Sequence, residues 1–137
     1  MRSALTRATA DSFCRHRRHA QLPATRCLPA RDRAYALSID LVSKLPRGHA
    51  VIADQLRRAS LSVPLNIAEG AGRTSLAEAA KHYAIARGSA MECAAIFDAM
   101  RVLTCIEPKL YETASGLVER VVAMLTKLHT STTGETH

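Results

Sequence analysis

The sequence predicts an all-α protein: an antiparallel, up-down-up-down four-helix bundle that assembles into a cyclic homo-oligomer. Its 137 residues are 47% hydrophobic but only 4% aromatic, and this composition suits closely packed helices better than a sheet sandwich. Four segments place apolar residues at helical spacing, and the short connections between them favour antiparallel neighbours. One of these helices carries a second apolar stripe, which indicates contact with further copies of the chain.

Residues 1–30 are predicted to form a disordered basic arm, because they lack helical or strand periodicity and contain two prolines. The arm has six arginines against one aspartate, a net charge of +5, whereas residues 31–137 carry only +2. Its Arg-rich composition resembles a transit peptide, and a start codon placed upstream of the folded domain explains it equally well. Nucleic-acid binding therefore does not follow from the overall basicity alone.

The cysteines predict reduced thiols in a cytoplasmic protein, because no two of the four form a Cys-x-x-Cys pair. The arm contains residue types that bind zinc, namely Cys14, His16, His19 and Cys27. Their spacing matches no common zinc motif, so we expect no metal. No apolar run reaches the length of about 18 residues that a membrane-spanning helix needs, so no membrane contact is expected.

The first helix is predicted over residues 31–44. Its broad apolar face includes Tyr35, Leu37 and Leu41. The following Leu45-Pro46-Arg47-Gly48 ends it, because the residue before a proline disfavours helical backbone and glycine favours turns.

The second helix is predicted over residues 49–71 and has two apolar stripes. The stripe expected to face the core consists of Ile52, Leu56, Ala59, Val63 and Ile67. Leu61, Leu65 and Ala68 form the other stripe, roughly opposite, and are predicted to be the oligomer interface. Pro64 lacks an N–H group, so a kink or a local break is expected near residues 60–64.

The third helix is predicted to begin at Ser75, which forms a capping box with Glu78, and to reach about residue 104. A line of small residues includes Gly88, and a glycine in mid-helix costs about 1 kcal/mol relative to alanine. A close neighbour is therefore expected against Gly88. The fourth helix is predicted over residues 107–129, with Pro108 in its first turn, and residues 130–137 are expected to be a flexible tail.

Polar side chains on the second and third helices predict a structural network between them. Its expected members are Asn66, Glu69, Ser89 and Glu92, with Arg58 or Arg87 paired to one of the glutamates. In a core rich in alanine such groups are costly to bury unless they are paired, so the network is expected to set helix register.

Catalysis has little support in the sequence. His82 has no acidic or cysteine partner at a useful spacing, and the glutamates form no Glu-x-x-His pattern. The glycines of Glu69-Gly70-Ala71-Gly72-Arg73 follow a helix and not a strand, so they are no dinucleotide fingerprint. We expect neither an enzyme nor a cofactor.

Basic residues near the turn between the second and third helices predict a nucleic-acid-binding surface: Arg57, Arg58, Arg73, Lys81 and Arg87. One copy offers a weak patch, whereas a ring of copies repeats it around a central opening and sums the attraction to phosphate. Aromatic residues beside the arginines are lacking, which argues against base stacking on single strands.

Two stretches, QLRRASLSVPLNIAEGAGR at 55–73 and HYAIARGSAMEC at 82–93, resemble a known family. It is the four-helix-bundle family encoded in intervening sequences of bacterial large-subunit ribosomal RNA genes, which is similar to the accessory protein (Avd) of diversity-generating retroelements. The resemblance covers about residues 31–129. It implies a barrel-like homopentamer, and Avd-like relatives are taken to bind nucleic acid and a reverse transcriptase through a basic surface.

The sequence thus favours a non-catalytic protein that binds RNA or structured DNA, or acts as a scaffold, as a homo-oligomeric ring. The alternative is a structural module that docks a partner protein in the groove of the ring without nucleic acid. The charge of only +2 over residues 31–137 departs from the strongly basic pattern of the Avd-like proteins.

Overall fold

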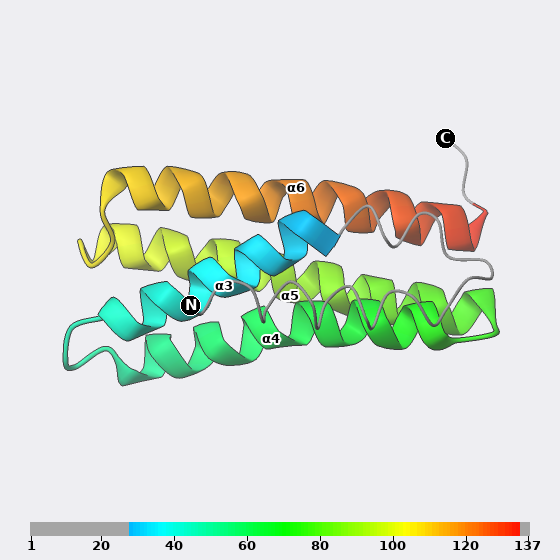
Figure 1. Ribbon diagram of the computed structural model, residues 1–137, viewed down its shortest axis with the longest axis horizontal. Helices are drawn as coiled ribbons and strands as arrows, with labels where there is room; N and C mark the ends of the chain where they lie inside the picture. The colour runs from blue at the N-terminus through cyan, green and yellow to red at the C-terminus, as the bar shows by residue number, and fades with distance from the viewer. Residues whose placement is uncertain (1–27, 135–137) are drawn as a thin grey trace, which may run out of the picture.

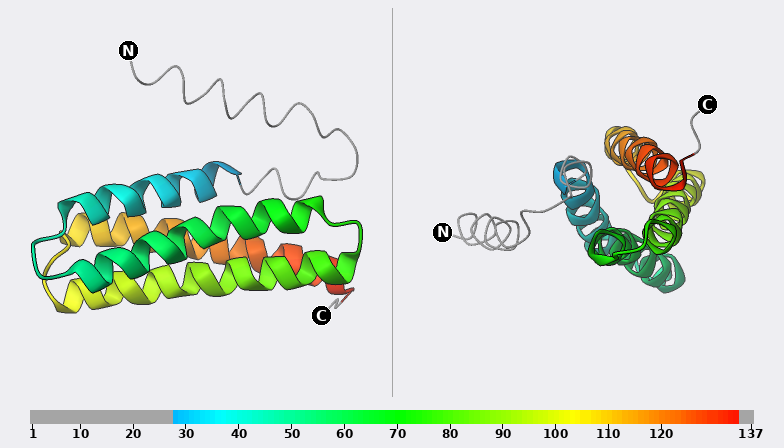
Figure 2. Two further views of the ribbon diagram at one scale, coloured as in Figure 1. Left: turned by 90° about the horizontal axis from the view of Figure 1, so that it is seen from below. Right: turned by 90° about the vertical axis from the view of Figure 1, so that its right-hand side faces the viewer.

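The fold is all-α, as predicted, and consists of four helices in the part of the chain that the structure describes, residues 28–134. In this computed structural model, α3 spans Leu28–Lys44, α4 Ala50–Gly72, α5 Leu76–Val102 and α6 Pro108–Thr133. Successive helices run in opposite directions along one long axis (Figure 1). Seen from the end, α4 lies between α3 and α5, and α6 lies beside α5 (Figure 2).

Two helix ends differ from the predicted ones by three residues or more. Helix α3 begins at Leu28, three residues before the predicted start, with Pro29 in its first turn where a missing N–H is harmless. Helix α6 continues to Thr133, so residues 130–133 do not belong to a flexible tail. The predicted disordered arm and the Cys14, His16, His19 and Cys27 group fall on residues 1–27, outside the described residues.

Local contacts account for the start of α5 and for the continuity of α4 through Pro64. Oγ of Ser75 accepts a hydrogen bond of 3.4 Å from the backbone N–H of Glu78, which confirms the predicted cap of α5. A kink or a local break was expected near residues 60–64. Helix α4 remains continuous through Pro64, so the chain has no break there. The surrounding helix is held by buried side chains on both sides of the proline, Ser60, Val63 and Ile67 among them.

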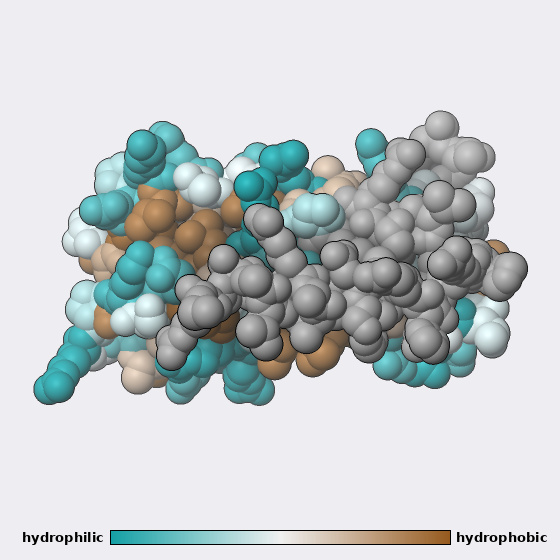
Figure 3. All heavy atoms as spheres, in the orientation of Figure 1, coloured by the Kyte–Doolittle hydropathy of each residue, from teal (hydrophilic) through white to brown (hydrophobic). Residues whose placement is uncertain are grey.

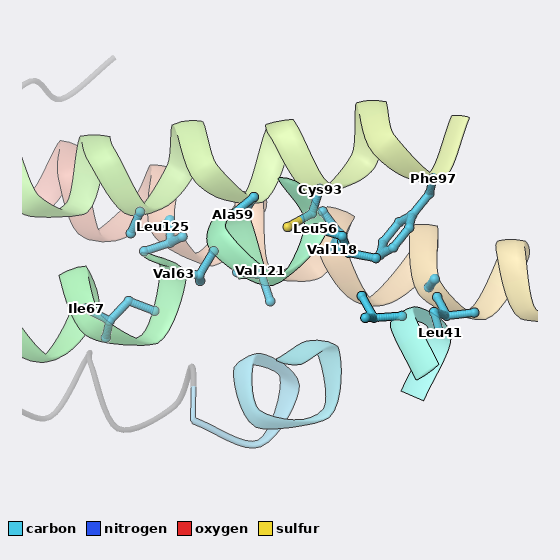
Figure 4. Packing of buried hydrophobic residues seen from close by; sticks show 14 of the residues in the cluster. Leu41, Leu56, Ala59, Val63, Ile67, Cys93, Phe97, Val118, Val121 and Leu125 are labelled. Carbon is cyan, nitrogen blue, oxygen red and sulfur yellow. The ribbon is translucent and has the colours of Figure 1, made fainter. Parts of the chain in front are cut away.

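The core is largely aliphatic, with the rings of Tyr83 and Phe97, and runs the length of the bundle. Phe97 is its largest fully buried side chain, and Leu56, Ile67 and Leu125 are equally closed to solvent. Figure 4 shows labelled side chains of α4, α5 and α6 pointing toward one another between the helices. The predicted core stripe of α4 is confirmed at four of its five positions, with Ile52 only half-buried.

Helices α4 and α5 approach each other closely at Gly70. A Cβ atom added there would lie 2.8 Å from Cε1 of the buried Tyr83 and 3.2 Å from the carbonyl oxygen of Ala79. A side chain at this position would therefore push the Tyr83 ring away. Gly88 shows the opposite: nothing lies within 4 Å of an added Cβ, so the close neighbour expected there does not come from the described part of the chain.

The thiol of Cys93 is buried in the centre of this core, with 2% of the residue exposed. Burial, with a smaller contribution from the charge of Glu92, raises the pKa of Cys93 from 9.0 to about 12. The folded chain therefore keeps this thiol protonated at a pH where the unfolded chain loses the proton. The resulting contribution to stability is complete below about pH 9 and is lost as the pH rises toward 12.

Cys93 predicts a specific alkaline loss of stability. Between pH 8 and pH 10 the wild-type chain should lose about 1.4 kcal/mol of unfolding free energy that a Cys93→Ala variant does not lose. Urea unfolding of both proteins at the two pH values measures this difference. A Val118→Ala variant, changed at a buried core residue without a titratable group, should keep the pH dependence of the wild type. Equal pH dependence of Cys93→Ala and wild type would contradict the assignment.

Candidate interface on helices α4 and α5

Four half-buried polar side chains join α4 to α5, and we call this set the polar seam: Ser62, Asn66, His82 and Ser89. Oγ of Ser89 donates to Oγ of Ser62 at 2.8 Å. Nδ2 of Asn66 donates to the carbonyl oxygen of Ser62 at 2.9 Å, which fixes the orientation of the amide. Its Oδ1 then lies 3.1 Å from Nδ1 of His82, and because an amide oxygen only accepts, Nδ1 must carry the proton.

The seam contains two of the four predicted network residues, Asn66 and Ser89. No buried side-chain nitrogen or oxygen in the described residues lacks a hydrogen-bond partner. Glu69 pairs instead with Arg73 on its own helix, and Glu92 is exposed. The expected pairing of Arg58 or Arg87 with a glutamate is therefore wrong for the described chain, whose ion pairs all join neighbours on one helix.

The seam also sets which residues of the two antiparallel helices lie at the same height. Ser62 is opposite Ser89, Asn66 is opposite His82, and Gly70 is opposite Ala79. Interpolating between these contacts places Leu65 level with Ile85 and Leu61 level with Gly88, to within about one helical turn. The two helices therefore present a matched pair of outer surfaces.

An exposed apolar strip follows this matched surface, and we define it by Leu61, Leu65 and Ala68 on α4 and by Ile85 and Gly88 on α5. Leu61 is 43% exposed, Leu65 58% and Ile85 50%, while Ala68 and Gly88 are also exposed. In Figure 3, hydrophobic surface is visible at the lower edge of the molecule over the middle of α4. The three residues predicted as an oligomer interface are thus not covered by their own chain.

The five predicted phosphate-binding cations do not form one dense cluster. Arg58 and Arg73 are 15 residues apart on α4, which corresponds to about 22 Å along the helix. Arg57 pairs with Asp54 at 2.9 Å and Arg73 pairs with Glu69, so two of the five charges are partly neutralised. Arg87 is half-buried and lies about 120° around α5 from the exposed Lys81. Arg57 and Arg58 are adjacent on α4, Arg73 directly follows the end of α4, and Lys81 lies near the start of α5.

Sequence reasoning missed three residues of this surface, and the reason differs between them. Ile85 lies between the seam and solvent, a position that periodicity alone assigns to neither face. Ser62 and His82 belong to the seam through contacts between two helices, which the periodicity of one helix does not reveal. Ser62 and Ser89 are 27 residues apart in the sequence. This separation indicates a contact between them only when the position of the turn at residues 73–75 is known.

Other kinds of site have no support in the described chain. Residues 28–134 contain no group of three or more His, Cys, Asp or Glu side chains that could hold a metal ion. Among the described helices, none combines the length and the hydrophobicity that crossing a membrane requires.

The comparisons with known proteins give one finding. A family model described as 23S rRNA-intervening sequence protein matches residues 29–127, which include all of α4 and α5 and nearly all of the described bundle. No curated protein is significantly similar to the chain.

Proposed function

The chain belongs to the 23S rRNA-intervening sequence protein family, and from this premise we propose that it is a non-catalytic, homo-oligomeric nucleic-acid-binding scaffold. Copies pack through the apolar strip into a barrel-like ring, for which five copies is the expected number. The assembled basic side chains bind the phosphates of RNA or structured DNA, in the cytoplasm. The similarity to Avd adds a reverse transcriptase as the proposed protein partner where the gene lies in a retroelement.

The main observation in support of the proposed assembly is the exposure of leucine and isoleucine side chains at the centre of two long helices. Leu61, Leu65 and Ile85 are each between 43% and 58% exposed, although a single bundle has a complete core without them. Covering a leucine or isoleucine side chain contributes roughly 1.5–3 kcal/mol relative to leaving it in water. A strip of such residues at matched heights on adjacent helices is typical of a protein interface.

Phosphate binding is supported by the accessibility of the cations. Arg57, Arg58, Arg73 and Lys81 are exposed, and the ion pairs of Arg57 and Arg73 are surface pairs within one helix. Such pairs contribute at most about 1 kcal/mol, so a phosphate group can replace the carboxylate. Repetition of the cations around an oligomer multiplies the number of phosphates that one complex neutralises.

The second candidate is a scaffold that binds a partner protein and no nucleic acid. The partial neutralisation of Arg57 and Arg73, together with a net charge of only +2 outside residues 1–30, favours it. In that case the apolar strip, or the groove of the assembled ring, holds the partner protein.

Nucleic-acid binding should respond to charge reversal on α4. Fluorescence anisotropy with a structured RNA at low salt should show a steep salt dependence. Arg57→Glu with Arg73→Glu should weaken binding at least about tenfold and flatten the salt slope by about one per lost phosphate contact. The matched control is Arg120→Glu with Lys127→Glu, which makes the same charge change on exposed positions of α6 and should have a smaller effect.

Each alternative has its own result in this experiment. Absence of binding by the full-length chain at low salt would contradict the nucleic-acid proposal and leave the protein scaffold. Binding that survives the α4 reversals but disappears on deletion of residues 1–27 would place the interaction in that segment and not on the bundle.

A further inference from the structure

Helix α3 has fewer buried residues than the other three helices, and all of them lie in its second half. Over residues 29–37 no side chain is fully buried, whereas Ser38, Leu41 and Val42 in the second half are. Each of α4, α5 and α6 has buried residues along most of its length. The attachment of α3 to the bundle therefore depends mainly on its second half.

Helix α3 also has no polar side-chain contact with another helix among residues 28–134. Its side-chain hydrogen bonds and ion pairs stay within the helix, as in the pair of Arg31 with Asp32. By contrast, the polar seam joins α4 to α5, and the hydroxyl of Tyr111 on α6 donates to Oδ1 of Asp98 on α5 at 2.6 Å. Apolar packing alone thus holds the side chains of α3 to the described bundle.

A cavity beneath the first half of α3 weakens this packing. It has room for about one water molecule, and its surface is almost wholly apolar. In Figure 4, Val63 and Val121 point toward the first turns of α3, drawn in pale blue. Side chains around a void lose packing contacts, and an apolar void offers water no hydrogen-bond partners. The lining includes Ala34 and Ser38 of α3 and, from the other helices, Val63, Cys93, Val118 and Val121.

We propose that residues 28–37 of α3 form a strap that opens as a local unit while the rest of the bundle stays folded, and that opening exposes the thiol of Cys93. Segments with few buried apolar contacts open at a lower free energy than the whole chain. The seam and the Tyr111–Asp98 hydrogen bond join α4, α5 and α6 without α3, so opening of the strap leaves them intact. The strap is a property of one chain and does not depend on assembly or on nucleic-acid binding.

Opening makes Cys93 reactive toward small disulfides. In the closed chain the thiol is 2% exposed and protonated, and only a thiolate attacks a disulfide. In the open chain the thiol gives its proton to water, and the thiolate attacks one sulfur of the disulfide. A new S–S bond forms to Sγ of Cys93, the old S–S bond breaks, and the second sulfur leaves as a thiolate. The added group is larger than the cavity and holds the strap open until a reducing thiol removes it.

Thiol labelling of the full-length chain tests the strap. A variant with Cys14→Ser, Cys27→Ser and Cys105→Ser keeps Cys93 as its one thiol. The probe is dithiobis(nitrobenzoate), an aromatic disulfide that releases a coloured thiolate, at pH 8. Opening of about ten residues exposes little surface, so below the unfolding transition the labelling rate should change less than about twofold per molar of urea.

A second buried thiol provides the control for global unfolding. In the same background, Cys93→Ala with Ala114→Cys moves the thiol to a position on α6 that is 1% exposed and does not line the cavity. This thiol reacts only when the whole chain unfolds. Its labelling rate should therefore be lower than that of Cys93 and should rise at least about fivefold per molar of urea.

Glycine at Ala36 tests whether residues 28–37 are the segment that opens. Ala36 is exposed on the strap, so Ala36→Gly weakens the helix without changing the packing, and it should accelerate labelling of Cys93 about fivefold. Ala123→Gly makes the same change at an exposed position of α6 and should leave this rate unchanged.

Three results would overturn the inference without bearing on the proposed function. The first is a Cys93 labelling rate that rises with urea as steeply as that of the Ala114→Cys thiol, because the thiol would then react only through global unfolding. The second is an equal rate in Ala36→Gly and its parent, which would place the opening outside residues 28–37. The third is loss of more helix on labelling, measured by circular dichroism, than about ten residues can account for.

Discussion

Replacing Leu61 and Leu65 together by aspartate is expected to separate the assembled protein into single chains without loss of helix. Within one chain these residues are 43% and 58% exposed, so they contribute little to the core. In an interface, the substitution removes two buried leucines and places unpaired carboxylates in a region shielded from water, which is costly. Because each leucine contributes roughly 1.5–3 kcal/mol, the dissociation constant should rise at least about a hundredfold.

The measurement is the mass in solution, together with the thermal unfolding of the same samples. Val102→Asp is a suitable control, because Val102 is a 79% exposed aliphatic residue at the end of α5, outside the apolar strip. It should leave the mass of the protein unchanged. RNA binding by the double variant should fall with the mass, since a single chain presents only its own few cations. Retention of the wild-type mass by the double variant would show that the strip is not the contact between copies.

Much of the fold could be predicted because its signals are local. The apolar spacing of α4, the cap at Ser75 and the proline-glycine turn after α3 each act within a few residues, and the structure has helices and turns in these places. The end of α6 lies beyond the predicted one, although residues 130–133 are polar. The hydroxyls of Thr130 and Thr132 donate to carbonyl oxygens one turn back, and Gly134 adopts the left-handed conformation with φ 72° that ends the helix.

The polar contacts between helices could be predicted only in part, because they depend on the register of two helices. Helical periodicity gives the direction of Asn66 and Glu69 around α4, but not which residue of α5 lies opposite. Long charged side chains such as Glu69 reach solvent and pair locally, whereas the short Ser62 and Asn66 side chains remain between the helices and meet Ser89 and His82. Exposure of the apolar strip was predictable from the second stripe of α4, but its continuation onto Ile85 was not.

Replacing Phe97 by alanine is expected to cause the largest loss of stability of any single core substitution in the described chain. Phe97 is 1% exposed and is the largest of the fully buried side chains, lying on α5 between the buried Cys93 and Met100. Figure 4 shows its ring directed toward the space between α5 and the neighbouring helices. Truncating a buried phenylalanine removes apolar contacts and leaves a cavity, which typically costs 3–5 kcal/mol, a large part of the total stability of about 5–15 kcal/mol.

Urea unfolding at a fixed protein concentration should show this loss, and thermal unfolding should show a Tm lower by at least about 10 °C. Phe97→Leu keeps much of the volume and should lose considerably less, while Val102→Ala on the same helix should change the unfolding free energy by no more than about 0.5 kcal/mol. The order of the three variants matters more than any single value, because it follows from burial alone. Equal destabilisation of Phe97→Ala and Val102→Ala would mean that solvent reaches the core of the bundle at Phe97. The distinction between a closed core and an exposed apolar strip would then be wrong.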